Sequence, residues 1–422
     1  MAMAMATFNL SFRAAYPVSI SRKLNEERHM PTHFNTVNRR PTVVIGSGIV
    51  GASAACDLVA RGVNVLLLEQ FQPGHDQGSS HGESRIIRYS YSDPFYASLM
   101  GDAFRAWAKL EADTGVSLYV RTGGLSFGPA DSDYVPKIAA NLKSLDVPCR
   151  LLSAAEVVGN YPGLRVPKDF LTVFEPSAGV LLASKAVKLL LELSTKVAGA
   201  LFELRPNYSV QSLDMDGEYP IIVGPNQERI EAERVIVAAG GWVKKLLPRE
   251  ASSIEVTRQN VFYLRPENLD AYRPGRWPVI IYKGDDDMDL FYSLPAMSDQ
   301  GVKLARHGGP VCDPEKVDRD VTEKDWEPVR DYIRKYLPAW DSAEIVSRST
   351  CLYTMTRDED FRVGPLEKHP RVILASPCSG HGFKFGPLIG RIVADLCETG
   401  MSDYDLQRWN PKRNSEQHKA SL

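Results

Sequence analysis

Residues 41–69 carry the pattern that most constrains the fold of this chain. An apolar run leads into closely spaced glycines, a helix of small residues is expected next, and a second apolar run ends on an acid. The first glycine would make the turn, the second would admit a pyrophosphate, and the third would let helix pack on strand, while the acid would accept ribose hydroxyls. This order predicts a dinucleotide-binding βαβ unit. Its parts are residues 41–45, Gly46, Gly48, Gly51, residues 52–61, residues 63–68 and Glu69.

Length and composition limit the class of protein. A chain of 422 residues is long enough for two domains and a large core. The net charge of -2 offers no basic surface to nucleic acid or to an acidic membrane, and no apolar run approaches membrane-spanning length. The six cysteines have no CxxC spacing and indicate neither a zinc site nor a disulfide framework. We therefore expect an enzyme without nucleic-acid or membrane partners.

Residues 1–40 differ from the rest of the chain. The first 25 residues contain basic and Ser residues but no Asp or Glu, as organelle transit peptides do. The alternative is an unstructured tail, with translation starting at Met30. The C-terminal Ala-Ser-Leu only loosely matches the peroxisomal Ser-Lys-Leu signal.

A cationic stretch follows the nucleotide motif. Ser80 and Glu83 have capping-box spacing, so we expect a helix to begin there. Such a helix would place His81, Arg85 and Arg88 on one face. This face either binds an anion, from the cofactor or a substrate carboxylate, or is simply solvated.

A further helix is expected to open at Asp93–Pro94. Its apolar residues recur at helical spacing, which indicates core packing and not a site. They are Phe95, Leu99, Phe104, Trp107 and Leu110.

The remaining pattern predicts two interleaved domains. Residues 233–241 form an apolar run that ends in glycines, as a returning strand of the nucleotide-binding sheet would. Short alternating segments between Val256 and Leu304 indicate an antiparallel sheet. The predicted fold class is α/β, with a Rossmann-like domain interleaved with a substrate domain of antiparallel sheet plus helices. The predicted boundaries are an extension at 1–40, nucleotide-binding segments at 41–120, 184–252 and 350–406, substrate-domain segments at 121–183 and 253–349, and a tail at 407–422.

Strand-like alternation after Gly301 places Lys303 and His307 on one face. A lysine between apolar neighbours is either partly buried, which is costly without a role, or an edge-strand lysine that blocks aggregation. The acidic run at residues 285–287 is either a loop tip or a cation site.

Two stretches near the C-terminus bring polar groups together. Alternation predicts a strand with Cys351 and Tyr353 on one face. A second stretch, residues 378–385, follows an apolar strand and precedes an apolar helix. Its Gly380 and Gly382 would let backbone approach a ligand and would direct a helix N-terminus at it.

Four motifs in this order resemble those of a known family. The chain resembles the monomeric sarcosine oxidase and L-pipecolate oxidase family of flavoenzymes from about Thr42 to Leu406. The motifs are Gly-Ser-Ser-His-Gly-x-Ser-Arg-x-Ile-Arg from Gly78, Lys-x-x-x-His from Lys303, Cys-x-Tyr-Thr-x-Thr-x-Asp-Glu-x-Phe from Cys351 and Ser-Gly-His-Gly-Phe-Lys from Ser379.

The resemblance implies an FAD that is covalently attached through Cys351. It implies that Arg88 and Lys384 hold the substrate carboxylate and that Tyr292 and Tyr353 line the substrate cavity. Two cations on one carboxylate would give charge-assisted bonds and fix its orientation. Basic side chains nearby would favour the thiolate that attacks the flavin.

The resemblance also implies roles around the reacting atoms. His307 would lie beside the substrate amine, Lys303 near the flavin where oxygen is reduced, and His81 and Arg85 close to the flavin ring. Two positions depart from the family pattern: Cys378, a second attachment candidate, and Gly364, where the family often has an acid.

We therefore expect a monomeric oxidase of small secondary α-amino acids that forms an imine and H2O2, with sarcosine and L-pipecolate as leading substrates. The alternatives are a flavin dehydrogenase that passes electrons to a protein or quinone, a nicotinamide-dependent dehydrogenase, and a non-catalytic flavoprotein. Family resemblance favours an intracellular, peroxisomal location, and the N-terminal extension favours a mitochondrion or plastid.

Overall fold

Five parallel strands build the sheet that carries the predicted nucleotide-binding unit, and one antiparallel strand closes its edge. The structure, a computed structural model, describes residues 40–286, 289–377 and 379–413. Runs rich in Val, Ile and Leu form these strands because both faces of a parallel sheet are covered. In spatial order the strands are β19 (Arg362–Pro365), β20 (Val372–Ser376), β13 (Arg234–Val237), β1 (Thr42–Ile45), β2 (Val65–Leu68) and β9 (Phe202–Arg205).

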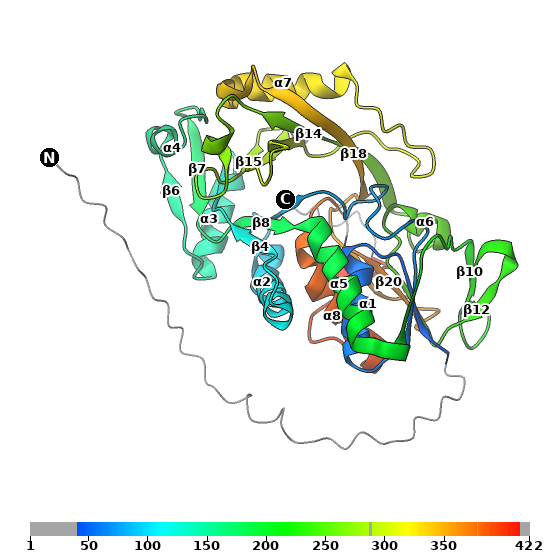
Figure 1. Cartoon of the computed structure of the whole chain (residues 1–422). Coiled ribbons are helices and arrows are strands. Elements are labelled where there is room, and N and C mark those ends of the chain that lie inside the picture. Colours follow the sequence, from blue (N-terminus) through cyan, green and yellow to red (C-terminus); the bar gives the residue numbers. More distant parts are fainter. Residues whose placement is uncertain (1–39, 287–288, 378, 414–422) are drawn as a thin grey trace. The chain divides into compact units, whose positions relative to one another are not determined.

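Helices cover one face of this sheet. α1 (Ile49–Ala60) packs between α5 (Ala183–Ala198) and α8 (Gly386–Thr399), as Figure 1 shows. A Cβ atom on Gly390 of α8 would lie 2.5 Å from the Cβ of Ser53 on α1, so only glycine permits this close approach. The small residues expected over 52–61 therefore serve helix packing.

A small antiparallel sheet covers the opposite face. Its strands are β10 (Ser212–Asp214), β11 (Ile221–Val223) and β12 (Arg229–Glu231), and they share an apolar cluster with α6 (Val243–Leu246) and the parallel strands. The predicted unit therefore has both faces buried, and its open side is the carboxyl edge of the strands.

An eight-stranded sheet forms the second layer of the molecule, with the parallel β15–β5 pair as the exception in otherwise antiparallel pairing. The aromatic side chains of α7 (Glu323–Tyr336) cover one of its faces, and α3 (Tyr134–Ser144) and α4 (Ala154–Asn160) pack near β7. In spatial order its strands are β18 (Glu344–Thr356), β14 (Ile254–Arg265), β17 (Val302–Arg306), β16 (Leu290–Leu294), β15 (Val279–Lys283), β5 (Gly124–Pro129), β7 (Phe170–Glu175) and β6 (Arg150–Leu152).

The helix expected to begin at Ser80 is wrong. Residues 84–87 instead form strand β3 (Ser84–Ile87), which pairs with β8 (Gly179–Leu182) in a sheet completed by β4 (Tyr119–Arg121). Gly82 has a φ of 92°, which no helical first turn allows. The distant partner strand overrode the local capping signal.

The helix expected at Asp93–Pro94 is confirmed as α2 (Pro94–Thr114). The Asp93 side chain accepts a hydrogen bond of 2.9 Å from the Phe95 amide, and Pro94 occupies the first turn. Trp107 and Leu110 are buried, as expected of core positions.

The predicted fold class is confirmed, whereas the domain boundaries stay a prediction. No helix in the part of the chain that the structure describes is long and apolar enough to cross a membrane. Residues 1–39 of the N-terminal extension, Asp287, Cys378 and the C-terminal Ala-Ser-Leu lie outside the described residues.

Candidate active site

A cavity of about 300 Å³ lies where the carboxyl edge of the parallel sheet meets one face of the eight-stranded sheet. Ligands of open α/β sheets bind outside the carboxyl ends of the strands. All the predicted site residues line this cavity except Gly51. Those that line it are Gly46, Gly48, Glu69, His81, Arg85, Arg88, Tyr292, Lys303, His307, Cys351, Tyr353, Gly380, Gly382 and Lys384.

Gly51 lies behind the cavity wall and permits its shape. A Cβ on Gly51 would be 1.8 Å from the carbonyl oxygen of Gly46. A Cβ on Gly46 would be 2.5 Å from the carbonyl oxygen of Ala238. Gly46 has a φ of 101°, in the region that favours glycine. The turn therefore depends on both glycines, and it places the start of α1 at the cavity wall, where a pyrophosphate is favoured.

The acid at the end of β2, Glu69, is buried and is kept charged by its hydrogen bonds. Glu69 is 3% exposed and accepts bonds from the Ser47 amide and hydroxyl, both at 2.8 Å. Burial raises the pKa of Glu69, but hydrogen bonds from His75, Ser47 and Phe71 outweigh burial and lower it. A buried, charged carboxylate beside a glycine turn fits the ribose of a dinucleotide. The nucleotide end of the cavity thus fits FAD.

Two buried cations lie at the other end of the cavity. Arg88 is 7% exposed and Lys384 is 6% exposed, and within the described ranges neither forms an ion pair with a carboxylate. Burial and the Arg88 charge hold the pKa of Lys384 well below its usual range. Two buried cations without a protein counter-anion form a site for an anion.

Phenols and a neutral histidine lie beside these cations. The hydroxyls of Tyr292 and Tyr353 are 3.3 Å apart, and the ring of His307 is 5.2 Å from that of Tyr353. Burial, with Lys283, Lys384 and Arg88, lowers the pKa of His307 to about 4, so the imidazole is neutral at pH 7. Its Nε2 has no hydrogen-bond partner among the described residues. It can therefore accept a proton or hydrogen bond from a ligand.

Lys303 is a buried lysine and not an edge-strand one. Strand β17 runs between β14 and β16, so the aggregation-blocking alternative is wrong. Lys303 is 4% exposed, and its Nζ donates a 2.9 Å hydrogen bond to the Ser84 carbonyl. Burial and the neighbouring Arg85 hold its pKa well below the usual range.

Cys351 is presented to the cavity from β18, where it pairs with Gln259 of β14. Burial raises the pKa of the thiol more than Arg85 and Lys303 lower it. Arg85 and Lys303 therefore favour the thiolate as expected, but burial in a low-dielectric wall is the larger effect, so the net pKa of the thiol is raised.

The cationic stretch lines the cavity although it is not helical. Burial and Arg85 lower the pKa of His81 to about 4. Arg85 donates to the carbonyls of Ser79 and Ser84, both at 2.8 Å. With Arg88, these residues line the cavity from strand β3 and its flanks in place of the expected helix, and their role towards an anion stays a prediction.

Sequence reasoning missed two residues of the site. Ser80 accepts a 3.0 Å hydrogen bond from the Ile49 amide at the start of α1. Tyr91 accepts a 2.9 Å hydrogen bond from the Nζ of Lys384. Ser80 lies in the motif that begins at Gly78 and Tyr91 lies outside the quoted motifs, but no motif indicates either hydrogen bond, because each contact joins distant segments. No group of three or more metal-ligating side chains occurs among residues 40–286, 289–377 and 379–413.

The glycine cradle, the buried acid and the anion site define a dinucleotide-dependent enzyme. A family model described as FAD dependent oxidoreductase matches residues 42–396. The chain belongs to this family, and its cofactor is FAD. The sequence-based resemblance to sarcosine oxidases is confirmed.

Two relatives and one solved structure show the extent of the similarity. A monomeric sarcosine oxidase of Streptomyces avermitilis is 32% identical over 88% of this chain and 97% of that protein. A peroxisomal sarcosine oxidase of Mus musculus is 30% identical over 90% of this chain and 97% of its own length. The solved structure of NikD, an amino acid oxidase essential for nikkomycin biosynthesis, has a TM-score of 0.78 at 23% identity and covers 90% of this chain and 100% of that one. This last likeness shows the fold.

Proposed function

We propose that the protein is an FAD-dependent oxidase of small secondary α-amino acids, of the sarcosine or L-pipecolate type. The C–N bond is oxidised to an imine, and O2 is reduced to H2O2. The observation that carries the proposal is the pair of buried cations, Arg88 and Lys384, which have no carboxylate partner within the described chain. They lie in a flavin-family cavity beside a neutral His307.

The side chains divide the binding of such a substrate between them. Arg88 and Lys384 would hold its carboxylate by charge-assisted hydrogen bonds and would disfavour the ammonium form of its amine. His307, neutral and with a free Nε2 in this structure, would accept the amine proton. The phenols of Tyr292 and Tyr353 would close the cavity around the amine.

The flavin, when bound, supplies the two-electron acceptor for this reaction. Lys303 would present a buried ammonium where negative charge develops on dioxygen, which is a preorganised electrostatic effect. His81 and Arg85 would lie along the flavin ring. The apolar side chains Leu290 and Leu294, which line the cavity, would accept the methyl or ring carbons of the substrate.

A substrate screen tests the proposal. Sarcosine and L-pipecolate should each consume O2 and release H2O2 in equal amounts, whereas sarcosinamide, which lacks the carboxylate, should react poorly. If substrate bleaches the flavin anaerobically but air restores the colour slowly, the protein is the alternative flavin dehydrogenase. If no secondary amino acid bleaches the flavin, the proposed substrate class is wrong.

We propose further that the flavin is attached through Cys351. The thiol lines the cavity, and attachment needs the loss of the proton that burial stabilises. After acid precipitation, wild-type protein should give a yellow pellet, and Cys351→Ser should release its FAD into the supernatant. Cys378→Ser is the control and should keep a yellow pellet. A yellow pellet from Cys351→Ser would remove Cys351 from the attachment site.

We also propose that the enzyme works as a monomer and in peroxisomes. The names of the relatives support both points, because one is called monomeric and the other peroxisomal. Gel filtration of the purified chain and imaging of a fluorescent fusion that leaves the C-terminus free would test them.

A further inference from the structure

Lys384 is held in place by Tyr91, which does not line the cavity, and by His381, which does. Its Nζ donates hydrogen bonds to the hydroxyl of Tyr91, at 2.9 Å, and to the carbonyl of His381, at 3.0 Å. Tyr91 is fully buried. The Tyr91 hydroxyl also lies 3.1 Å from Nδ1 of His381. Lys384 therefore ends a chain of buried hydrogen bonds.

The direction of this chain follows from its far end. The Nε2 of His381 lies 3.0 Å from the carbonyl oxygen of Glu359, and a carbonyl can only accept, so Nε2 must carry a hydrogen. Burial, together with Lys384, holds the pKa of His381 well below its usual range, so the ring is neutral and Nδ1 must accept. The Tyr91 hydroxyl then donates to Nδ1, and its lone pairs face the Lys384 ammonium. Every donor and acceptor has one consistent assignment.

Glu359 starts the chain from a constrained turn. It has a φ of 58°, in the left-handed region that a non-glycine residue seldom adopts. Its neighbours Asp358 and Asp360 are completely buried. If the charges of Asp358 and Asp360 are both paired, these two buried side chains fix the position of the Glu359 carbonyl between them.

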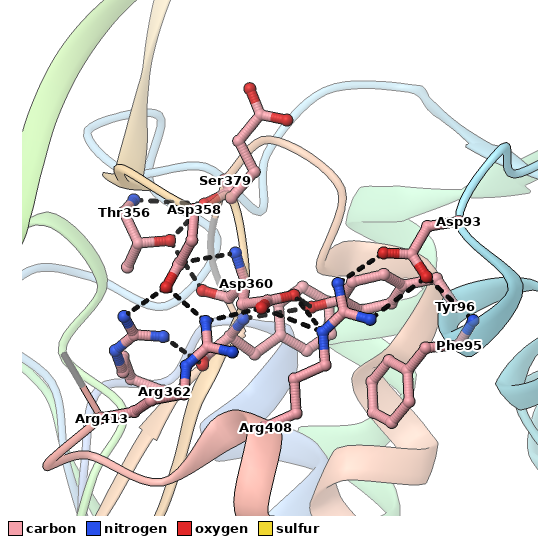
Figure 2. Close-up of polar contacts among 12 residues, drawn as sticks. Asp93, Phe95, Tyr96, Thr356, Asp358, Asp360, Arg362, Ser379, Arg408 and Arg413 are labelled. Atoms are coloured by element: carbon pink, nitrogen blue, oxygen red, sulfur yellow. Dashed lines mark hydrogen bonds and ion pairs between the residues drawn. The ribbon is translucent and has the colours of Figure 1, made fainter. Parts of the chain in front are cut away.

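Arginines pair both carboxylates, and two of these arginines come from the C-terminal segment (Figure 2). Arg362, the first residue of β19, donates to Asp358 at 2.9 Å. Arg408 donates to Asp360 at 2.9 Å, and Arg413 contacts both Asp358 and Asp360. The C-terminal segment thus closes over the turn from outside.

Tyr96 connects this network to the histidine a second time. Its hydroxyl donates to Asp360 at 3.0 Å, and its ring meets that of His381 edge to face at 4.7 Å. The imidazole is therefore fixed by packing as well as by hydrogen bonds. Arg408 also pairs with Asp93, the residue that caps the helix carrying Tyr96.

We infer that Glu359, His381 and Tyr91 form a directed hydrogen-bond chain that positions Lys384 for an anionic group, and that Arg408 and Arg413 hold the start of this chain. The inference rests on the proposed function for the identity of the anion, a substrate carboxylate. Tyr91 and His381 are positioning residues, because they act on the anion through Lys384. The C-terminal segment therefore belongs to the substrate site, through Arg408 and Arg413.

Acetate binding tests the link between Tyr91 and Lys384. Acetate carries the carboxylate but no amine, and its binding to the flavin-containing protein can be followed by flavin absorbance. Tyr91→Phe should raise the Kd for acetate about tenfold, the effect of one lost hydrogen bond to a charged group. Tyr332→Phe, which removes a buried phenol in the distant aromatic cluster, should leave the Kd unchanged.

A double-mutant cycle separates positioning from general damage. In a Lys384→Met background, Tyr91→Phe should add little further loss of acetate affinity, because its partner is gone. An unchanged Kd in Tyr91→Phe, or an equal loss in both backgrounds, would overturn the inference while leaving the carboxylate site intact. If wild-type protein prefers acetamide to acetate, the proposed function fails and the positioning role fails with it.

The tautomer of His381 provides a readout independent of activity. With ¹⁵N-labelled histidine, and His381→Asn to assign the signal, wild-type protein at pH 7 should show hydrogen on Nε2 and none on Nδ1. Hydrogen on Nδ1, or a protonated ring, would overturn the direction of the chain. Because the Glu359 carbonyl already requires hydrogen on Nε2, this measurement tests the direction of the chain, and the acetate measurements test the role of Tyr91.

The C-terminal link is tested with a neighbouring pair of basic residues. Arg413→Gln should raise the Kd for acetate about threefold, as substitutions along a coupled network do. Lys412→Gln, which removes an exposed cation paired with Glu367, should not. If both variants bind acetate with the same Kd, the C-terminal segment does not contribute to the position of Lys384. If Arg413→Gln does not fold, Arg408→Gln measured in the same way decides.

Discussion

The two ends of the cavity are built in different ways. The nucleotide end uses backbone from one continuous stretch, with Gly46, Gly51 and Glu69 within 24 residues of each other along the chain. The substrate end uses side chains from segments that are far apart, such as Arg88 after β3 and Lys384 before α8. Backbone shape at one end and side-chain charge at the other should therefore respond differently to substitution.

The largest expected effect is at the nucleotide end. Gly46→Ala places a Cβ 2.5 Å from the Ala238 carbonyl oxygen at a φ of 101°. Strain of this kind costs about 1–3 kcal/mol before the overlap is counted, so the variant should lose both bound flavin and thermal stability. Gly159→Ala, on α4 with no atom within 4 Å of the new Cβ, is the matched control and should keep both. A yellow, stable Gly46→Ala protein would show that backbone shape does not limit this end.

The next effect should be confined to the substrate end. Arg88→Ala leaves a buried substrate carboxylate with Lys384 as its remaining cation. Loss of one partner of a buried charge pair costs about 2–5 kcal/mol. The kcat/KM for sarcosine should fall accordingly, while the flavin spectrum stays normal. Arg105→Ala, which removes an exposed arginine on α2, should change neither quantity. If Arg88→Ala instead loses its flavin, the two ends are not separable.

A third substitution tests whether the substrate end has a separate oxygen site. Lys303→Met keeps the length and apolar volume of the side chain but removes its charge. Anaerobic reduction by substrate should change little, whereas reoxidation by air should slow about a hundredfold, as for loss of one preorganised electrostatic partner. Stopped-flow absorbance measures both half-reactions. Lys185→Met is the control, because that exposed lysine also donates to a backbone carbonyl. Wild-type reoxidation in Lys303→Met would assign the buried lysine a structural role.

The same contrast explains what the sequence could predict. The nucleotide end was predictable from spacing alone, because each glycine has a local steric reason. The helix expected at Ser80 was wrong because β8 pairs with residues 84–87 from almost a hundred residues away. No pattern in the sequence predicts such a partner. The family resemblance supplied most of the substrate end instead.

The chain behind Lys384 was beyond sequence reasoning for a related reason. The apolar stripe of α2 correctly predicted core packing, yet Tyr96 on that helix also bonds Asp360, which lies 264 residues further on. A buried tyrosine in an apolar stripe gives no sign of its hydroxyl partner. Polar groups in a core find partners wherever the fold brings them, because leaving them unpaired is costly.

The smallest expected effect compares two cavity histidines, His81 from the stretch before β3 and His307 from the substrate end. Folding lowers the pKa values of His81 and His307 to about 4, against an unperturbed value of about 6.5. Between these values the unfolded chain binds more protons than the folded one, so the free energy of unfolding falls as the pH drops from 6.5 towards 4. Each histidine should account for about 2 kcal/mol of the loss between pH 7 and pH 5.

Replacing each histidine by glutamine tests this expectation. In urea unfolding followed by tryptophan fluorescence, His307→Gln and His81→Gln should each lose less stability than wild type between pH 7 and pH 5, and the double variant should lose least. If the two single substitutions reduce the loss of stability equally, burial sets the pKa of both histidines, since burial is the largest cause of the lowered pKa at each position. A pH dependence unchanged in His307→Gln would mean that its imidazole is hydrated in solution. In that case the pKa of His307 would be the same in the folded and unfolded chain, and neither burial nor the cations at the substrate end would lower it.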